Sequence, residues 1–194
     1  PSKYIHIGGD EAAMKHWGKC PKCQERMKKE GLKDEHALQS YMIHRIEKYL
    51  NSKGRKLIGW DEILMGGLAP DATVMSWRGE EGGIEAAKAG HDVVLTPGNP
   101  VYLDFYQREA NGEPRANGGF NTLEKVYGYN PMPKELTPEQ GKHILGAQAN
   151  LWTEYVLNEK HAEYMLFPRI IALAEVTWTP QQERRYSDFI ARME

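Results

Sequence analysis

The 194-residue sequence predicts an α/β fold in which a parallel sheet is joined by helical crossovers. Two observations support this prediction. Short apolar runs alternate along the chain with segments whose apolar residues recur every three or four positions. Each short run also ends in an acid or a large aromatic residue, and the carboxyl ends of parallel strands meet at one edge of a sheet. A (β/α)8 barrel places its active site at that edge.

The first predicted strand spans residues 4–7 and leads into a turn that carries two acids. Gly8 and Gly9 follow the strand, and glycine lets a backbone bend or approach a ligand closely. Asp10 and Glu11 therefore lie at the carboxyl end of a strand. The segment that follows Glu11 is expected to be irregular.

The other elements continue the alternation. Asp34 is a candidate N-cap for a long amphipathic helix that closes over residues 51–54. Pro168 is expected to kink a later helix, and Thr179 begins a capping-box pattern that starts a terminal helix. Residues 97–140 show little periodicity and favour a functional loop. The remaining predicted elements are strands at residues 56–60, 72–77, 92–96 and 144–149, and helices at residues 82–89 and about 160–175.

Composition argues against several classes of partner. The net charge is -2 and acidic and basic residues are interspersed, so nothing indicates a nucleic-acid or anionic-membrane partner. No apolar run approaches the roughly 20 residues that a membrane-spanning helix needs. Cys20 and Cys23 form a C-x-x-C motif without a second Cys/His pair at suitable spacing, which favours two thiols or a local disulfide over a zinc site. We expect no metal and no organic cofactor.

Residues suited to sugar chemistry fall at the predicted strand ends. Asp10 and Glu11 are adjacent, whereas most glycosidases hold two carboxyl groups on opposite sides of the scissile bond, roughly 5 Å or more apart. The adjacent pair fits better a mechanism in which the substrate supplies its own nucleophile. Trp60, Trp77 and Trp152 also fall at strand ends. Their aromatic faces could stack on the apolar faces of a sugar.

The stretch His6-Ile7-Gly8-Gly9-Asp10-Glu11 resembles the signature of glycoside hydrolase family 20, the β-N-acetylhexosaminidases. Further stretches match that family in the same order: Gly59-Trp60-Asp61-Glu62, Ser76-Trp77-Arg78-Gly79, Val101-Tyr102-Leu103-Asp104, Ala149-Asn150-Leu151-Trp152-Thr153-Glu154, and Phe167-Pro168-Arg169 with Ala174-Glu175. The resemblance implies a (β/α)8 barrel of which residues 1–194 supply strands four to eight. The first three strands and any N-terminal domain would lie outside this sequence. An open barrel of this kind is expected to form a homodimer or to pair with the missing part, and to be inactive alone.

The resemblance also implies an activity, the exo-acting hydrolysis of terminal non-reducing N-acetylhexosamine residues of glycans, through an oxazolinium-type intermediate and with retention. Glu11 would be the general acid and base, Asp10 would orient the substrate acetamido group, and Tyr102 would hydrogen-bond its carbonyl oxygen. The tryptophans would enclose the acetamido methyl group, and two further acids would bind sugar hydroxyls. The residues expected to bind substrate are Trp60, Trp77, Asp104, Trp152 and Glu154.

Two other functions stay open on the sequence. One is a non-catalytic carbohydrate-binding or interaction module. The other is a metal-dependent barrel enzyme that uses His6, Asp10 and Glu11 as ligands, although no further ligands are evident at the other strand ends. His6 could equally be a hydrogen-bonded histidine of the barrel interior.

Some features of the sequence have no assigned role or depart from the family. Asp61 and Glu62 match a family motif, but no role follows for them. A tryptophan that the family often carries is missing from residues 97–140, where Tyr127 or Tyr129 could take its place. The preference between gluco and galacto substrates is open. The resemblance favours the periplasm, the lysosome or the outside of the cell.

Overall fold

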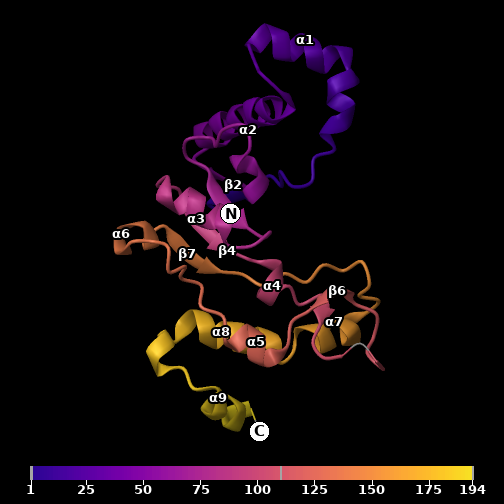
Figure 1. Cartoon of the computed structure of the whole chain (residues 1–194), viewed down its shortest axis with the longest axis vertical. Helices are drawn as coiled ribbons and strands as arrows, with labels where there is room; N and C mark the ends of the chain where they lie inside the picture. The colour runs from indigo at the N-terminus through magenta and orange to yellow at the C-terminus, as the bar shows by residue number, and fades with distance from the viewer. Residues whose placement is uncertain (1, 110, 194) are drawn as a thin grey trace.

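The computed structural model describes residues 2–109 and 111–193, and it confirms the predicted parallel sheet. Five strands pair in the order β1-β2-β3-β4-β7, and every pairing is parallel (Figure 1). The strands are β1 (Tyr4–His6), β2 (Lys56–Trp60), β3 (Thr73–Ser76), β4 (Val93–Leu95) and β7 (Ile144–Ala147). Each one falls within a predicted strand. Within the described residues, β1 and β7 each pair on one side only, as the outer strands of a partial (β/α)8 barrel do.

Helices α2 (Glu35–Ser52) and α3 (Glu81–Lys88) pack against this sheet. As predicted, Asp34 caps α2, because its carboxylate accepts a hydrogen bond from the N–H of Ala37 at 2.8 Å. Gly54 follows the helix with a φ of 68°, a left-handed conformation that favours glycine. The fully buried residues of this first core are Ile43, Leu57, Ile63, Ala69, Ala72, Val74, Ala86, Ala87, Val93 and Leu95.

The segment after Glu11 is not irregular, so that expectation is wrong. It contains a 3-10 helix, η1 (Met14–Lys19), and a regular helix, α1 (Pro21–Glu30). Within α1, only Met27 is buried, so the helix has no broad apolar face for a periodicity argument to detect. Its signals are local: proline stands in the first turn, and Gly31 closes the helix with a φ of 67°.

Residues 97–140, predicted as a long loop, fold into several short elements. These are α4 (Gly98–Val101), β5 (Phe105–Tyr106), β6 (Asn117–Phe120), α5 (Leu123–Tyr127) and α6 (Pro138–Gly141). The strands β5 and β6 pair as a second, two-stranded sheet. The buried side chain of Arg169 donates hydrogen bonds to the backbone carbonyls of Leu103, Phe105 and Asn121 in this segment. These hydrogen bonds join residues that are far apart in the sequence. They stabilise short elements whose sequences show no hydrophobic periodicity.

The helix expected at about residues 160–175 is in fact two helices. They are α7 (Glu159–Leu166) and α8 (Arg169–Trp178), and the helical conformation is interrupted between them at Phe167-Pro168. Proline lacks the N–H that would continue the helix, and it restricts the residue before it to extended conformations. Pro168 therefore ends one helix and begins another, rather than kinking a single one.

The capping box expected at Thr179 does not form. The N–H of Thr179 instead bonds to the carbonyl oxygen of Glu175, so this residue ends α8. A short 3-10 turn, η3 (Gln181–Glu183), follows it, and the terminal helix α9 (Tyr186–Met193) begins later than predicted. The aromatic rings of Phe189 in α9 and Tyr127 in α5 lie 4.8 Å apart in a second core beneath α8.

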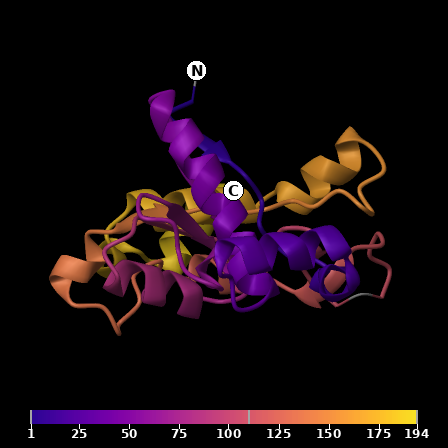
Figure 2. The ribbon, with the colours of Figure 1, turned by 90° about the horizontal axis from the view of Figure 1, so that it is seen from above.

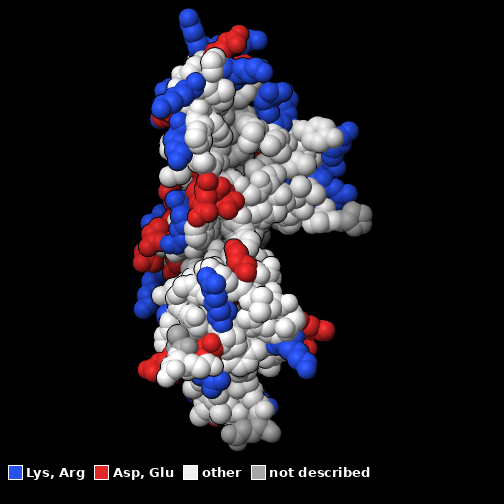
Figure 3. Space-filling model, turned by 90° about the vertical axis from the view of Figure 1, so that its right-hand side faces the viewer, with Lys and Arg blue, Asp and Glu red and all other residues white. Residues whose placement is uncertain are grey.

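The molecule is elongated, with α1 at one end and α9 at the other (Figure 1). Seen from above, α6 and α7 lie on opposite sides (Figure 2). On the face shown in Figure 3, basic side chains gather at the upper end, over α1, and acidic and basic side chains mix below it. In the part of the chain that the structure describes, every helix is too short or too polar to cross a membrane.

Candidate active site

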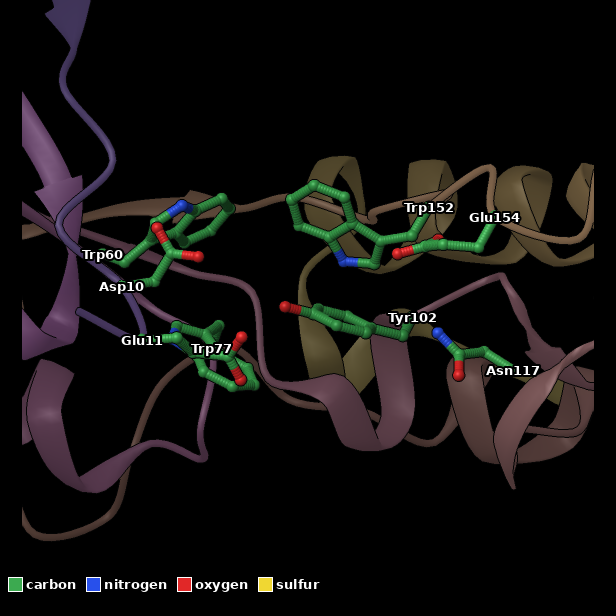
Figure 4. Close-up of a pocket in the computed structure, with 8 residues that line it drawn as sticks. All are labelled: Asp10, Glu11, Trp60, Trp77, Tyr102, Asn117, Trp152 and Glu154. Atoms are coloured by element: carbon green, nitrogen blue, oxygen red, sulfur yellow. The ribbon is translucent and has the colours of Figure 1, made fainter. Parts of the chain in front are cut away.

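A cavity of about 270 Å³ lies beyond the carboxyl ends of the strands. The structure brings together there every site residue proposed from the sequence except Asp104. Figure 4 shows the acids of the first turn on one side of the cavity and Glu154 on the other, with aromatic rings between them. The lining residues are Asp10, Glu11, Trp60, Trp77, Tyr102, Asn117, Trp152 and Glu154.

The turn that presents Asp10 and Glu11 has an unusual backbone. Gly8 and Gly9 have φ angles of 70° and 102°, and Glu11 has a φ of 46°, which is uncommon for a residue other than glycine. A Cβ atom on Gly9 would lie 2.6 Å from Cγ2 of Ile63, so only glycine fits there. Left-handed geometry at a side chain costs about 1–3 kcal/mol and is concentrated at functional sites.

Neighbouring elements hold this turn in place. The carbonyl oxygen of Gly8 accepts a hydrogen bond from the N–H of Trp60 at 2.9 Å. The carbonyl oxygen of Gly9 accepts a hydrogen bond of 2.8 Å from the side-chain amide of Gln39, which is buried in α2. Strand β2 and helix α2 thus fix the position from which Asp10 and Glu11 extend. Both acidic side chains are exposed to solvent.

Aromatic rings from four segments form the middle of the cavity. Trp77 stacks on Tyr102 with 6.4 Å between ring centroids and 14° between planes. Trp152 meets Tyr102 edge to face with 6.2 Å between centroids, and its ring is tilted against that of Trp60 at 5.8 Å. Figure 4 shows the hydroxyl of Tyr102 directed toward the side that holds Asp10 and Glu11. Burial raises the pKa of Tyr102, so its hydroxyl stays protonated near neutral pH and can donate a hydrogen bond.

Asp104 is the one proposed site residue that does not line the cavity. Its side chain is 2% exposed, and neither carboxylate oxygen has a hydrogen-bond partner in the described residues. Burial raises the pKa of this carboxyl group. Such an unpaired polar group is costly unless something supplies donors to it.

Asn117 lines the cavity but was missed from the sequence. Its backbone N–H donates a hydrogen bond of 2.9 Å to the carbonyl oxygen of Asp104, and this bond brings β6 to the cavity wall. Asn117 belongs to no motif that we recognised. The only signal near it was the length of the aperiodic segment at residues 97–140, which indicated a functional loop without indicating which residue faces the site.

His6, Asp10 and Glu11, considered above as possible metal ligands, do not form a metal-binding group. Across residues 2–109 and 111–193, no three or more His, Cys, Asp or Glu side chains are arranged to hold a metal ion. The Nδ1 atom of His6 accepts a hydrogen bond of 3.0 Å from the N–H of Gly8, and its ring meets Trp60 edge to face at 4.8 Å. Desolvation lowers the pKa of this imidazole, and Asp10 partly offsets the effect.

Comparison with known proteins gives a consistent result. Residues 1–181 match the family described as "Glycosyl hydrolase family 20, catalytic domain". A "Beta-hexosaminidase" of Porphyromonas gingivalis is 54% identical over 195 residues, which are 100% of this chain and 25% of that protein. A "Beta-hexosaminidase" of Vibrio furnissii is 40% identical over 90% of this chain and 29% of that protein. The chain therefore spans about a quarter of the length of these relatives.

Solved structures agree with these matches. The exo beta-N-acetylglucosaminidase of Vibrio harveyi, in complex with N-acetylglucosamine, has a TM-score of 0.88 and 35% identity, over 100% of this chain and 31% of that chain. The beta-N-acetylhexosaminidase of Bacteroides fragilis has a TM-score of 0.83 and 33% identity, over 100% of this chain and 39% of that chain.

Proposed function

Because the chain belongs to glycoside hydrolase family 20, we propose that it is the C-terminal part of a catalytic barrel that removes terminal non-reducing N-acetylhexosamine residues from glycans. The names of its relatives support this substrate class, since they are hexosaminidases and one binds N-acetylglucosamine. The longer protein that this proposal implies is called the parent protein below. Its first three strands would cover the free edges of β1 and β7.

The observation that carries the proposal is the position of Asp10 and Glu11. The two acids are adjacent on a left-handed turn, and across from them the Tyr102 hydroxyl faces the same space (Figure 4). Adjacent carboxylates cannot take opposite sides of a glycosidic bond as acid and nucleophile. One acid is therefore free to transfer protons while the other holds a group of the substrate.

In the proposed first step, the acetamido carbonyl oxygen attacks the anomeric carbon as the bond to the leaving oxygen breaks. Glu11 donates a proton to that oxygen, and an oxazolinium-type intermediate forms. Asp10 accepts a hydrogen bond from the acetamido N–H and stabilises the positive charge that develops, while Tyr102 donates to the acetamido oxygen and aims it. Water then attacks the anomeric carbon as Glu11 takes its proton, and the configuration is retained.

The walls of the cavity support the same substrate. Aromatic faces suit the apolar side of a pyranose ring and an acetamido methyl group. The volume of about 270 Å³ lies just below the usual range of small-molecule sites. Glu154 and Asn117 line the side of the cavity away from Glu11, where we propose that they receive sugar hydroxyls. Asp104 would bind a hydroxyl only if its buried carboxylate became accessible.

The test is release of nitrophenol from the aryl N-acetyl-β-glucosaminide by the parent protein, by its Glu11→Gln variant and by the 194-residue chain alone. We expect turnover in the parent protein and a loss of about 100-fold to 10,000-fold in the variant, whose amide cannot transfer the proton. We expect none from the chain alone, because the cavity is open beside β1 and β7.

Three results would change this view. Normal turnover by the Glu11→Gln variant would remove its proposed role. Binding of N-acetylglucosamine without turnover in the parent protein would favour a carbohydrate-binding module. Activity of the chain alone would mean that two copies complete a site, or that the missing strands are not needed.

A further inference from the structure

Glu62 is a buried carboxylate outside the cavity that the proposed mechanism does not use. It lies in η2 (Asp61–Leu64), directly after β2, and it is 8% exposed. A buried carboxylate requires partners. Its partners are Trp77 and Arg78, which follow the end of the neighbouring strand β3. Trp77 is one of the tryptophans that line the cavity.

The first partner is the indole of Trp77. Its Nε1–H donates a hydrogen bond of 2.9 Å to Oε2 of Glu62. An indole has one donor and no acceptor, so this bond selects one orientation of the ring. A half-turn of the ring would move the donor away and leave a buried carboxylate oxygen without a partner.

The second partner is Arg78, which joins Glu62 to Asp61. The Nε atom of Arg78 lies 3.8 Å from Oε1 of Glu62 and 3.2 Å from Oδ2 of Asp61. Asp61 is 2% exposed, and α3 packs closely against it. A Cβ atom added to Gly82 of α3 would lie 2.8 Å from the Cβ atom of Asp61. Asp61 and Glu62 therefore share the guanidinium of Arg78, which helps to hold Glu62 beside Trp77.

The orientation of Trp77 matters because its ring lies nearly parallel to that of Tyr102. Trp77 stacks on Tyr102 with planes 14° apart, and both residues line the cavity. In the proposed mechanism these two rings hold the acetamido group and aim its oxygen. A change in the tilt of Trp77 would alter the wall against which the acetamido group is proposed to lie.

We infer that Glu62 is a positioning residue, which fixes the ring of Trp77 through its N–H and thereby sets the place of the acetamido group against Glu11. The inference rests on the proposed function, since it assigns Glu62 to the same site. It also gives a role to Glu62, for which the sequence suggested none.

The experiment is a double-mutant cycle in the parent protein, with Glu62→Leu, Trp77→Phe and both changes together. Phenylalanine keeps an aromatic ring but has no N–H. We expect each single change to lower kcat/KM about tenfold to a hundredfold, mostly through kcat, because small displacements of a reacting group are expensive. The double variant should be no worse than about twofold below Trp77→Phe.

Further variants separate positioning from general support. Glu62→Gln keeps an acceptor for the indole and should stay within about threefold of the unmodified protein. Glu47 is a matched control: it is 5% exposed in α2 and accepts a hydrogen bond of 2.8 Å from the N–H of Asp71, away from the cavity. Its change to leucine should lower stability and leave kcat/KM unchanged.

The affinity of the same four proteins for free N-acetylglucosamine is also measured. This second measurement gives a result even if the proteins show no turnover. Additive effects of Glu62→Leu and Trp77→Phe in both measurements would overturn the inference, as would unchanged behaviour of Glu62→Leu. Failure of the proposed function would appear differently, as no turnover in the unmodified parent protein or normal turnover by its Glu11→Gln variant.

Discussion

The indole rings of Trp60 and Trp152 lie 5.8 Å apart, centroid to centroid, although β3 and β4 separate the strands that precede them in the sheet. Trp60 ends β2, and Trp152 follows β7. In a flat sheet, neighbouring strands are about 4.8 Å apart, so residues three strands away would not touch. The contact therefore depends on a sheet that curls about an axis roughly along its strands, as in a barrel, and on the segment after β7 that carries Trp152.

Trp152 is expected to contribute to substrate binding in the parent protein, because its contact with Trp60 holds both rings in the cavity wall. Trp152 is 38% exposed, so substrate would bury its ring on binding. Trp152→Ala should then lower kcat/KM by about tenfold to a hundredfold, which corresponds to the roughly 1.5–3 kcal/mol gained when one apolar side chain is buried. Steady-state kinetics on the aryl N-acetyl-β-glucosaminide would measure it. Trp178, 88% exposed and outside the cavity, is the matched control. Equal losses from Trp178→Ala and Trp152→Ala would contradict the assignment.

Asp61 should make stability depend on pH. Burial raises its pKa from 3.8 to about 6, although Arg78 opposes the shift. The folded protein therefore holds this proton more tightly than the unfolded chain, and the contribution of Asp61 to the free energy of unfolding falls as pH rises from about 4 to 6. Its full size is at most about 3 kcal/mol.

The measurement for Asp61 is the melting temperature of the parent protein across this pH range, compared with its Asp61→Asn variant. Asparagine cannot ionise, so the variant should lose less stability than the unmodified protein as pH rises. Parallel curves for the two proteins would show that the carboxyl of Asp61 does not titrate in this range.

Arg169 is expected to be a large contributor to stability. Its side chain is fully buried, and it donates hydrogen bonds of 2.5–3.0 Å to the carbonyl oxygens of Leu103, Phe105, Asn121 and Met165. Arg169→Met would leave several of these acceptors buried and unpaired, at a cost of about 3–5 kcal/mol in total. Urea unfolding of the parent protein would measure the loss.

The control for Arg169 is Arg185, an exposed arginine whose side chain bonds only to the nearby carbonyls of Gln182 and Arg184 among the contacts that the structure gives. Arg185→Met should change the free energy of unfolding by less than about 0.5 kcal/mol. If both variants unfold at the same urea concentration, the carbonyl cluster around Arg169 does not stabilise the fold as described.

The two cysteines should differ in reactivity. Both are free thiols, with Cys20 at the N-cap of α1 and Cys23 in its first turn. Hydrogen bonds from the backbone N–H and thiol of Cys23 lower the pKa of Cys20, and the same contact raises that of Cys23. Because the thiolate is the nucleophile, Cys20 should react faster with iodoacetamide near neutral pH.

Mass spectrometry of peptides after brief alkylation would measure this difference. Cys23→Ser keeps a side-chain donor, since a hydroxyl donates at least as well as a thiol, and should leave Cys20 activated. Cys23→Ala keeps only the backbone N–H and should slow the alkylation of Cys20. Faster labelling of Cys23 than of Cys20 would contradict the predicted order.

Local sequence signals explain which elements could be predicted. The strands from β1 to β4 and β7 lie in short, largely apolar runs, and α2 has both an N-cap at Asp34 and a glycine beyond its end. Helix α1 was missed because it buries little, and the helices on either side of Pro168 were merged because their apolar faces continue across the break. Periodicity reports burial, so it fails where a helix is solvated or where burial spans two helices.

By itself, the sequence determined the alternation of strands and helices and the acids and aromatic residues at the strand ends, because these depend on neighbours a few positions away. Only the tertiary structure decided that Trp152 reaches Trp60, that Asn117 enters the cavity wall while Asp104 lies buried behind it, and that Glu62 holds Trp77. Those outcomes depend on the curvature of the sheet and on hydrogen bonds between distant segments. Neither has a period or a spacing along the chain, so neither can be read from it in advance.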